Sequence, residues 1–590
     1  MLELQQEMLS LAFLTQSGVT VSLLILAVLF IYWRGTRGFA DLNKFNVGGP
    51  KPVPFFGNVL ETWKYDGLHH LHLDFFKKYG KVFTICLGGK PSLVVGDPEL
   101  LKQIMVKDFP YFRNRVLDGP PTNTAFSKSV LAARGDDWKR IRNTLTPLFS
   151  SGKMKMMMPL IERSCDTLLE KLDDISDADR SVDMQDWFRK MTLEVILTTI
   201  FGVDANIQKG ENLELLRQAN RIVRISYAIR LIARLPFGRI IFRLLGKIRG
   251  PKQNYIQGIA EDIVKSRRQQ GFTERKDLLQ LMMAAAAEGL GKLTDEEIVG
   301  QMIFFLLTGY ETSSNTLSFI LYHLAVNPDI QDKLREEVRR AMDVNENKKN
   351  LYEIVSAIEY LDCVIKEAQR LNTPVPFVNR ECAEDYDYNG IHIPAGTEVI
   401  IPIYAVHHDP DAWVEPEKFD PERFRGPASN TRHPFQHLPF GDGPRYCLGM
   451  RLALLEIKIA LVKILMKFKF VRSPETQVPL IIRCGIFLSA NDGVVVGVES
   501  LLKCRDGTVV RALASHQCGP GLERSEFQLI DVRLLDVKNE NHGNQRRKTV
   551  EVLEKKVSLF KTILADPSTI ISEENDPVWM LHGNGRVFTK

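Results

Sequence analysis

The segment PFGDGPRYCLG, residues 439–449, presents a single thiol, Cys447, among turn-forming residues. A zinc site needs about four protein ligands, and the nearest His or Cys in the sequence is His437. A nucleophilic cysteine needs a neighbouring base, and the segment specifies none. The chemistry that remains for Cys447 is that of an axial ligand to a metal whose other positions a cofactor fills, namely haem.

The other residues of this segment suit such a ligand. Gly441, Gly443 and Gly449 let the backbone approach a flat macrocycle and point amide N–H groups at the sulfur. A helix that starts near Leu448 places its positive end beside the thiol, which lowers the thiol pKa. Arg445 supplies a positive charge for a haem carboxylate.

Polar residues at helical spacing occur in three further places. TGYETSS, residues 308–314, interrupts an apolar helix pattern, and buried polar groups in a helix need partners. Glu367 and Arg370 are three residues apart, and Trp138 and Arg142 are four apart, so each pair shares a helix face. Taken alone, the first segment fits a helix turned partly to solvent, and the pairs fit an exposed helix surface.

Together these residues resemble a known family. The pattern F-G-x-G-x-R-x-C-x-G resembles the haem-thiolate signature of the cytochrome P-450 family, and its fixed positions are Phe440, Gly441, Gly443, Arg445, Cys447 and Gly449. The resemblance covers about residues 20–500. Finer matches, among them FRNR, WKRIR, SSGKM and YAVHHDP, are similar to the animal microsomal group that includes the vertebrate 3A enzymes and their insect relatives.

The resemblance implies a fold, a cofactor and a set of residues that act in catalysis. The fold is mainly α with a small β portion, a single large haem domain behind an N-terminal membrane anchor, and the cofactor is heme b (iron-protoporphyrin IX). Cys447 is the implied metal ligand. Gly309 would open a groove for dioxygen, and Thr312 with Glu311 would deliver protons. Thr308 departs from the family, which usually has Ala or Gly at this position.

The resemblance also implies which residues bind the cofactor and which only support its site. We expect the haem to be held by Trp138, Arg142, Arg115, Arg380, Phe440, Arg445 and Gly449. Glu367, Arg370 and Arg423 resemble the family's buried Glu–Arg–Arg network, whose role is structural.

The implied function is a monooxygenase that inserts one oxygen atom of dioxygen into a lipophilic small molecule, such as a xenobiotic, steroid or fatty acid. NADPH would supply the electrons through a membrane-bound NADPH–cytochrome reductase, with cytochrome b5 as a second candidate partner. Two alternatives stay open: a reductase-independent endoperoxide or hydroperoxide isomerase of the thromboxane-synthase type, and a non-catalytic haem-binding protein. The substrate is not readable from the sequence.

Composition and the N-terminal segment predict a protein that is anchored in a membrane and whose cysteines lie in the reducing cytosol. A net charge of +5 on 590 residues argues against a nucleic-acid binder, and eight cysteines without regular spacing suggest free thiols. No charged residue occurs in residues 8–33, which is long enough to span a bilayer. Glu3 and Glu7 precede this run and Arg34 and Arg37 follow it, so we expect a single-pass endoplasmic reticulum anchor with the catalytic domain facing the cytosol.

Long helical periodicities dominate residues 60–500, with strand patterns near the two ends of this region. Pro159 suits the first position of one helix. We expect helices at 131–148, 159–172, 184–200, 295–326, 330–342, 361–370 and 448–468, and strands at 81–88, 91–96 and 397–406.

The chain divides by these patterns into three parts: an anchor and basic linker at 1–47, a haem domain at 48–500, and an atypical tail at 501–590. The tail is more polar and has one plausible helix, at 549–565. Within the haem domain, residues 221–250 carry eight basic residues and no acidic one among apolar residues, which favours a second contact with membrane lipid.

Overall fold

The computed structural model describes residues 19–30, 32–88, 90–117, 125–177, 181–223, 234–235, 254–270, 277–287, 293–344, 350–426, 431–501, 579–582 and 586–589. The chain divides into two compact units, Met1–Leu501 and Leu502–Lys590. In the second unit the described residues form one antiparallel pair, β12 (Trp579–His582) with β13 (Arg586–Thr589). The start of the anchor, most of the basic segment at 221–250 and the tail helix expected at 549–565 lie outside the described residues.

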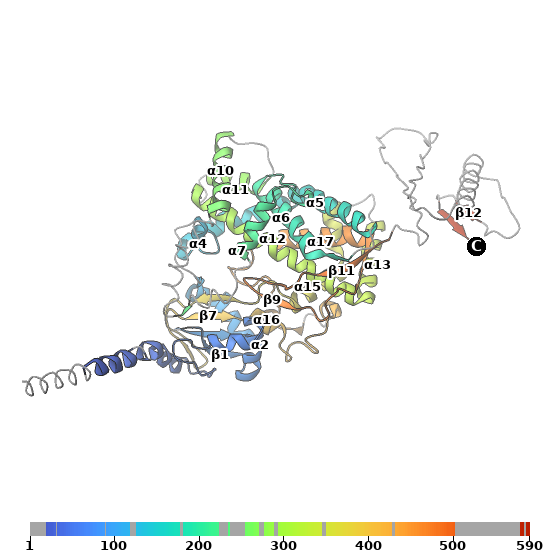
Figure 1. The fold of residues 1–590 in the computed structure, drawn as a ribbon. Coiled ribbons are helices and arrows are strands. Elements are labelled where there is room, and N and C mark those ends of the chain that lie inside the picture. Colours follow the sequence, from blue (N-terminus) through green and yellow to red (C-terminus); the bar gives the residue numbers. More distant parts are fainter. Residues whose placement is uncertain are drawn as a thin grey trace, which may run out of the picture. The chain divides into compact units, whose positions relative to one another are not determined.

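Helices make up most of the first unit, as the sequence predicts (Figure 1). Their bounds are α2 (Leu68–Tyr79), α3 (Pro98–Lys102), α4 (Gly135–Leu145), α5 (Ser151–Asp177), α6 (Met184–Ile196), α7 (Leu213–Val223), α10 (Asn254–Gln270), α11 (Leu278–Ala287), α12 (Asp295–Val326), α13 (Pro328–Val344), α14 (Leu351–Ala357), α15 (Glu359–Leu371), α16 (Ile403–His407) and α17 (Met450–Lys467).

The central helix is α12, which packs against α6, α10, α15 and α17. Its start is fixed by a capping box, in which the Thr294 side chain accepts from the Glu297 amide and the Glu297 carboxylate accepts from the Thr294 amide. Acidic residues in its first turn also stabilise the helix, because their negative charges lie near the positive end of the helix dipole. The helix has the bounds predicted from the sequence and is buried along most of its length.

The β portion is small and mostly antiparallel, as expected. The largest sheet has the strand order β1-β2-β7-β4, in which only β2 and β7 run parallel. Its strands are β1 (Val82–Cys86), β2 (Pro91–Val95), β7 (Glu398–Ile401) and β4 (Val378–Glu381). The smaller sheets of this unit are formed by β3 (Ser181–Asp183), β11 (Val495–Ser500) and β8 (Phe468–Val471), by β5 (Tyr386–Tyr388) and β6 (Ile391–Ile393), and by β9 (Ile482–Cys484) and β10 (Leu488–Ala490).

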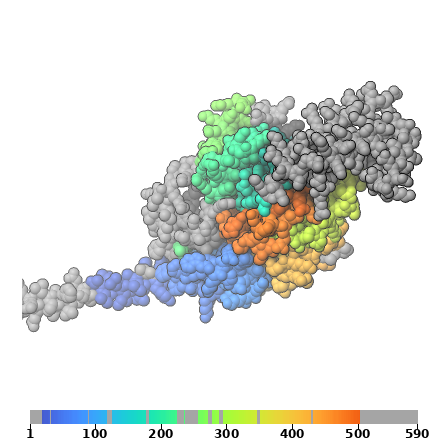
Figure 2. Space-filling model, turned by 45° about the vertical axis from the view of Figure 1, so that its right-hand side comes forward, coloured from blue at the N-terminus to red at the C-terminus, as the bar shows by residue number. Residues whose placement is uncertain are grey.

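Two large hydrophobic cores and one small cluster, Tyr404 with Cys484 and Leu488, stabilise this unit. The larger lies among the helices around α12. The smaller joins residues between Phe45 and Phe112 to residues between Cys382 and Leu438, so segments far apart in sequence share one core. In Figure 2 these segments, blue and orange-yellow, lie next to each other on one face. This second core supports the sheet on which Arg380 is carried.

Two predictions of element boundaries are wrong. Pro159 lies inside α5, not at its start, because the helix begins at Ser151 and its early residues Met154 and Met157 are buried in the core. The strand expected at 397–406 ends at Ile401. Pro402 follows, and a proline has no N–H to continue a strand ladder, so the chain turns into α16.

Among the described residues, one helix is long and apolar enough to cross a membrane, Val19–Phe45. Length and composition alone identify it. Its large apolar side chains described between Val19 and Trp33 are exposed, whereas Phe45 at its end is buried. It agrees with the part of the predicted anchor that the structure describes.

Candidate active site

A cavity of about 1160 Å³ lies between α12, α6, α17 and the segment that carries Cys447. Its wall is mainly apolar, with aromatic side chains that include Phe126, Phe304 and Phe487. Of the cofactor-binding and catalytic residues that the sequence predicts, all but Glu311 line this cavity. They are Cys447, Gly309, Thr312, Trp138, Arg142, Arg115, Arg380, Phe440, Arg445 and Gly449.

The segment around Cys447 is held in a tight turn by its own backbone. The Cys447 amide donates to the Phe440 carbonyl, at 2.9 Å. Gly443 has φ +69°, and a Cβ atom on it would overlap the Met105 carbonyl. Glycine is therefore required at 443 by protein packing.

The Cys447 side chain is exposed to the cavity, and the cavity itself lies inside the protein. Burial consequently raises the pKa of the Cys447 thiol. Amide N–H groups of Gly449 and Met450 at the start of α17, and the cations Arg142 and Arg115, act in the opposite direction by favouring the thiolate. These are the features expected around a sulfur that binds as an anion.

Three arginines face the same cavity with unused hydrogen-bond donors; Arg142 and Arg380 are buried, and Arg115 is partly buried. Arg115 Nε, Arg142 Nη2 and Arg380 Nε are buried and have no hydrogen-bond partner among the described residues. None of the three forms a described ion pair with a carboxylate of the chain. Burial lowers the pKa of Arg115 to about 10 and also lowers the pKa of Arg142 and Arg380. Uncompensated buried cations are costly, so this group needs an anionic partner.

Arg445 differs from these three arginines. Its guanidinium donates to the backbone carbonyls of Arg113, Val130 and Ala133, at 3.0–3.1 Å. It also lies 4.2 Å from the centre of the Trp138 ring, a cation–π contact. In this structure Arg445 and Trp138 hold the chain around the cavity, and the carboxylate role predicted for Arg445 stays a prediction.

The polar segment of α12 divides between two faces. Thr312 faces the cavity, but Glu311 points the other way and forms a buried ion pair with Arg189 of α6, with N–O distances of 2.9 and 3.1 Å. A Cβ atom on Gly309 would lie 2.5 Å from Ile196 Cδ1, so this glycine allows α12 to approach α6. The proton delivery expected of Thr312 with Glu311, and the dioxygen groove expected at Gly309, stay predictions.

The cytochrome P-450 family model matches residues 47–496 of the chain. The chain belongs to the cytochrome P-450 family. Its relatives include cytochrome P-450 3A11 of Mus musculus, 38% identical over 78% of this chain and 92% of the relative. Cytochrome P-450 3A29 of Sus scrofa is 35% identical over 84% of this chain and 98% of the relative.

Haem is therefore the cofactor of this P-450, and the cavity can be tested for its fit. Haem carries two carboxylates and an iron that accepts a thiolate. The unpartnered donors of Arg115, Arg142 and Arg380 supply what the carboxylates need, and Cys447 supplies the one thiol among the described cavity residues. The residues that line the cavity therefore fit haem.

Two residues that contribute to this site were not predicted from the sequence. Arg189 was missed because it lies 122 residues from its partner Glu311. Glu456 was missed although it is an acid within an apolar helix, nine residues after Cys447, which is a signal that could have found it. It is fully buried in α17, and it is the single carboxylic acid among the described residues that line the cavity of this P-450.

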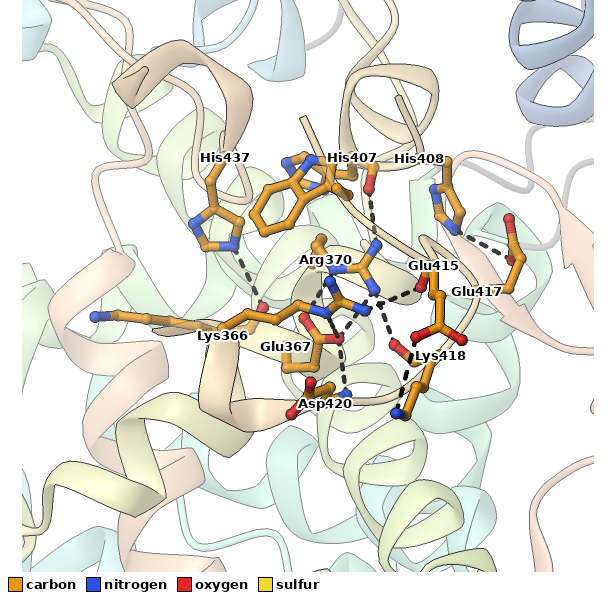
Figure 3. Close-up of polar contacts among 12 residues, drawn as sticks. Lys366, Glu367, Arg370, His407, His408, Glu415, Glu417, Lys418, Asp420 and His437 are labelled. Atoms are coloured by element: carbon orange, nitrogen blue, oxygen red, sulfur yellow. Dashed lines mark hydrogen bonds and ion pairs between the residues drawn. The ribbon is translucent and has the colours of Figure 1, made fainter. Parts of the chain in front are cut away.

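Glu367 and Arg370 lie at the centre of a group of polar contacts that also includes His407 and Asp420 (Figure 3). Arg370 and Glu367 are both fully buried and form a two-point pair, at 2.8 and 2.9 Å. Arg370 also donates to the His407 carbonyl, and Arg423 lies 3.3 Å from Glu367. His407 Nε2 in turn accepts from the Leu438 amide, just before the cysteine segment. These contacts give the network the structural role expected from the sequence.

Proposed function

We propose that this P-450 is a reductase-dependent monooxygenase whose substrate is a lipophilic small molecule and whose iron ligand is Cys447. Membership of the family makes the chain a haem monooxygenase and an oxidoreductase. One observation carries the residue assignment: one thiol and three arginines meet in a single cavity with mainly apolar walls, and each arginine has one side-chain nitrogen without a hydrogen-bond partner among the described residues.

Each group of residues has a definite task in this proposal. When bound, haem supplies the activation of dioxygen. Cys447 binds as a thiolate, and the amides of Gly449 and Met450 stabilise its negative charge. Arg115, Arg142 and Arg380 neutralise the carboxylates of the cofactor.

The apolar wall binds the substrate and excludes water from it. Thr312 places a hydroxyl on this wall, where it can hold a water molecule or a proton close to the substrate. Glu311, paired with Arg189, keeps the polar turn of α12 in position.

The proposal includes a location and an electron donor. Microsomal relatives and the apolar helix Val19–Phe45 support attachment to the endoplasmic reticulum membrane. With the cationic residues of the linker on the cytosolic side, the haem domain would face the cytosol, where a membrane-bound NADPH–cytochrome reductase docks near the cysteine segment. Cytochrome b5 is a second candidate electron donor.

The test is the carbon-monoxide difference spectrum of the reduced, haem-loaded protein. We expect the red-shifted band of thiolate ligation, and we expect Cys447→Ser to abolish it. Cys86→Ser is the matched control, because a hydroxyl can replace the Cys86 thiol, which donates to the Gly88 carbonyl at 3.0 Å. A parent spectrum without the red shift, or a Cys447→Ser spectrum that retains it, would contradict the proposal.

Turnover assays test the reductase dependence separately. We expect a lipophilic substrate to be oxidised with NADPH and reductase, and no product to form from a hydroperoxide or endoperoxide substrate alone. Isomerisation without reductase would instead support the alternative of a thromboxane-synthase type of enzyme.

A further inference from the structure

Three threonines form a row along the cavity face of α12. Thr308, Thr312 and Thr316 are spaced four residues apart, so their side chains lie one above another, and all three line the cavity. Each hydroxyl donates to the backbone carbonyl four residues earlier. The distances are 2.7 Å from Thr308 to Phe304, 2.7 Å from Thr312 to Thr308, and 2.8 Å from Thr316 to Thr312.

These hydrogen bonds decide what the row offers to a bound molecule. A hydroxyl has one proton to donate and two lone pairs that accept. Because each threonine proton is already used within the helix, the side chains present only acceptor sites to the cavity. A group that binds there has to be a hydrogen-bond donor.

Thr308 is the member of the row best placed to bind substrate. It is half-buried, whereas Thr316 is only 3% exposed, and Thr312 lies at the position where we propose that a proton is held. Near Thr308 the cavity wall is apolar, with Phe304, Leu307 and Ile196. An acceptor within an apolar wall selects among ligands more strongly than one in a polar wall, because few other groups there can replace it.

The apolar wall favours a neutral donor over a cationic one. Removing an ammonium group from water costs much more free energy than a hydrogen bond to one hydroxyl oxygen returns. A neutral hydroxyl group has a much smaller desolvation cost, and the Thr308 oxygen can accept a hydrogen bond from it directly.

We propose that Thr308 is a specificity-determining residue that accepts a hydrogen bond from the hydroxyl group of a lipophilic alcohol substrate. The inference rests on the proposed function and names the substrate class for that site. It gives a role to the threonine found where the family usually has Ala or Gly.

The test compares two isomeric ligands that differ in one donor. 1-Undecanol and decyl methyl ether have the same atoms, but only the alcohol has an O–H group. We expect the haem-loaded full chain to bind the alcohol with a lower Kd than the ether. Thr308→Val, which keeps the branched shape but removes the acceptor, should weaken alcohol binding about fivefold and change ether binding less than twofold.

Thr308→Ser is the conservative control, because it retains the hydroxyl and should keep most of the preference for the alcohol. Equal losses for both ligands in Thr308→Val, or a serine variant that behaves like the valine variant, would overturn the inference. Each sample is first checked by its carbon-monoxide spectrum. Failure of the proposed function therefore appears in that spectrum, whereas failure of this inference appears only in the ratio of the two Kd values.

Discussion

At the scale of single residues, Glu456 makes a prediction about stability and pH. One of its carboxylate oxygens, Oε1, has no hydrogen-bond partner among the described residues, and Ser313 hydrogen-bonds the carboxyl group. Burial raises the pKa of Glu456 to about 8, from an ordinary value of 4.5. The folded protein therefore keeps this proton between pH 4.5 and 8, whereas the unfolded chain loses it.

Because the folded state binds more protons in this range, Glu456 makes the free energy of unfolding decrease as pH rises from about 4.5 to 8. We expect Glu456→Gln to remove up to about 1.4 kcal/mol per pH unit of that decrease, measured by urea unfolding at pH 5, 6.5 and 8. The control is Glu422→Gln, at an exposed glutamate that pairs with Lys333. If both variants follow the pH dependence of the parent, Glu456 is ionised in the folded state.

The residues of the site were predictable to different degrees. Cys447 and its glycines form one continuous segment, so their spacing alone carries the information. The direction in which Glu311 points was not predictable, because it depends on Arg189 in another helix. The packing of Gly309 likewise depends on Ile196. The sequence predicts which polar residues lie on α12, but only the fold decides which of them face the cavity.

At the scale of elements, α15 and α13 contain the same ion pair in two environments. Glu367 and Arg370 in α15 are fully buried, and Glu336 and Arg339 in α13 are about half-exposed. Both pairs are three residues apart, and each has a contact near 2.9 Å. When a buried pair loses one partner, an uncompensated charge is left in the protein interior, which is strongly destabilising. An exposed pair contributes little to the free energy of unfolding.

We therefore expect Glu367→Ala to lower the free energy of unfolding by about 3–5 kcal/mol, and Glu336→Ala by less than about 1 kcal/mol. Unfolding in urea, followed by circular dichroism, measures both. Similar losses in the two variants would show that burial of the pair is not what makes it important. A large loss confined to Glu367→Ala would support its role as the platform beside the cysteine segment.

Boundaries of elements were predictable where a local signal marks them. α12 begins at a capping box that the sequence contains, and its predicted bounds agree with the structure. α5 begins eight residues before Pro159, because burial of Met154 and Met157 outweighs the preference of proline for a helix start. Tertiary packing overrides a weak local preference, and the pattern of one sequence segment alone does not predict that packing.

At the scale of the whole molecule, buried histidines make the free energy of unfolding depend on pH. Burial lowers the pKa of seven histidines. The effect is smaller for His70 and large for the other six, which are His69, His72, His323, His407, His408 and His437. Both ring nitrogens of His69 and of His72 have no hydrogen-bond partner among the described residues. The Leu438 amide donates to His407 Nε2, which requires that this nitrogen carries no proton. The folded protein therefore holds these rings neutral.

These histidines act on stability in the direction opposite to Glu456. Above pH 6.5 they are neutral in both the folded and the unfolded state, so they do not affect the free energy of unfolding. Below pH 6.5 the unfolded chain binds protons that the folded state does not bind. We expect the free energy of unfolding to fall steeply from pH 6.5 to 5, since six histidines outweigh one glutamate. Each histidine contributes up to about 2 kcal/mol at pH 5.

The decisive comparison is between a buried and a more exposed histidine. His72 packs edge-on against Phe377, so His72→Phe keeps an aromatic ring in place and should make the pH slope shallower by one proton. The control is His392→Phe, at a partly exposed ring that contacts the exposed Asp387. If His72→Phe leaves the slope as steep as in the parent, His72 is protonated inside the folded protein, and the acid sensitivity of the molecule has another origin.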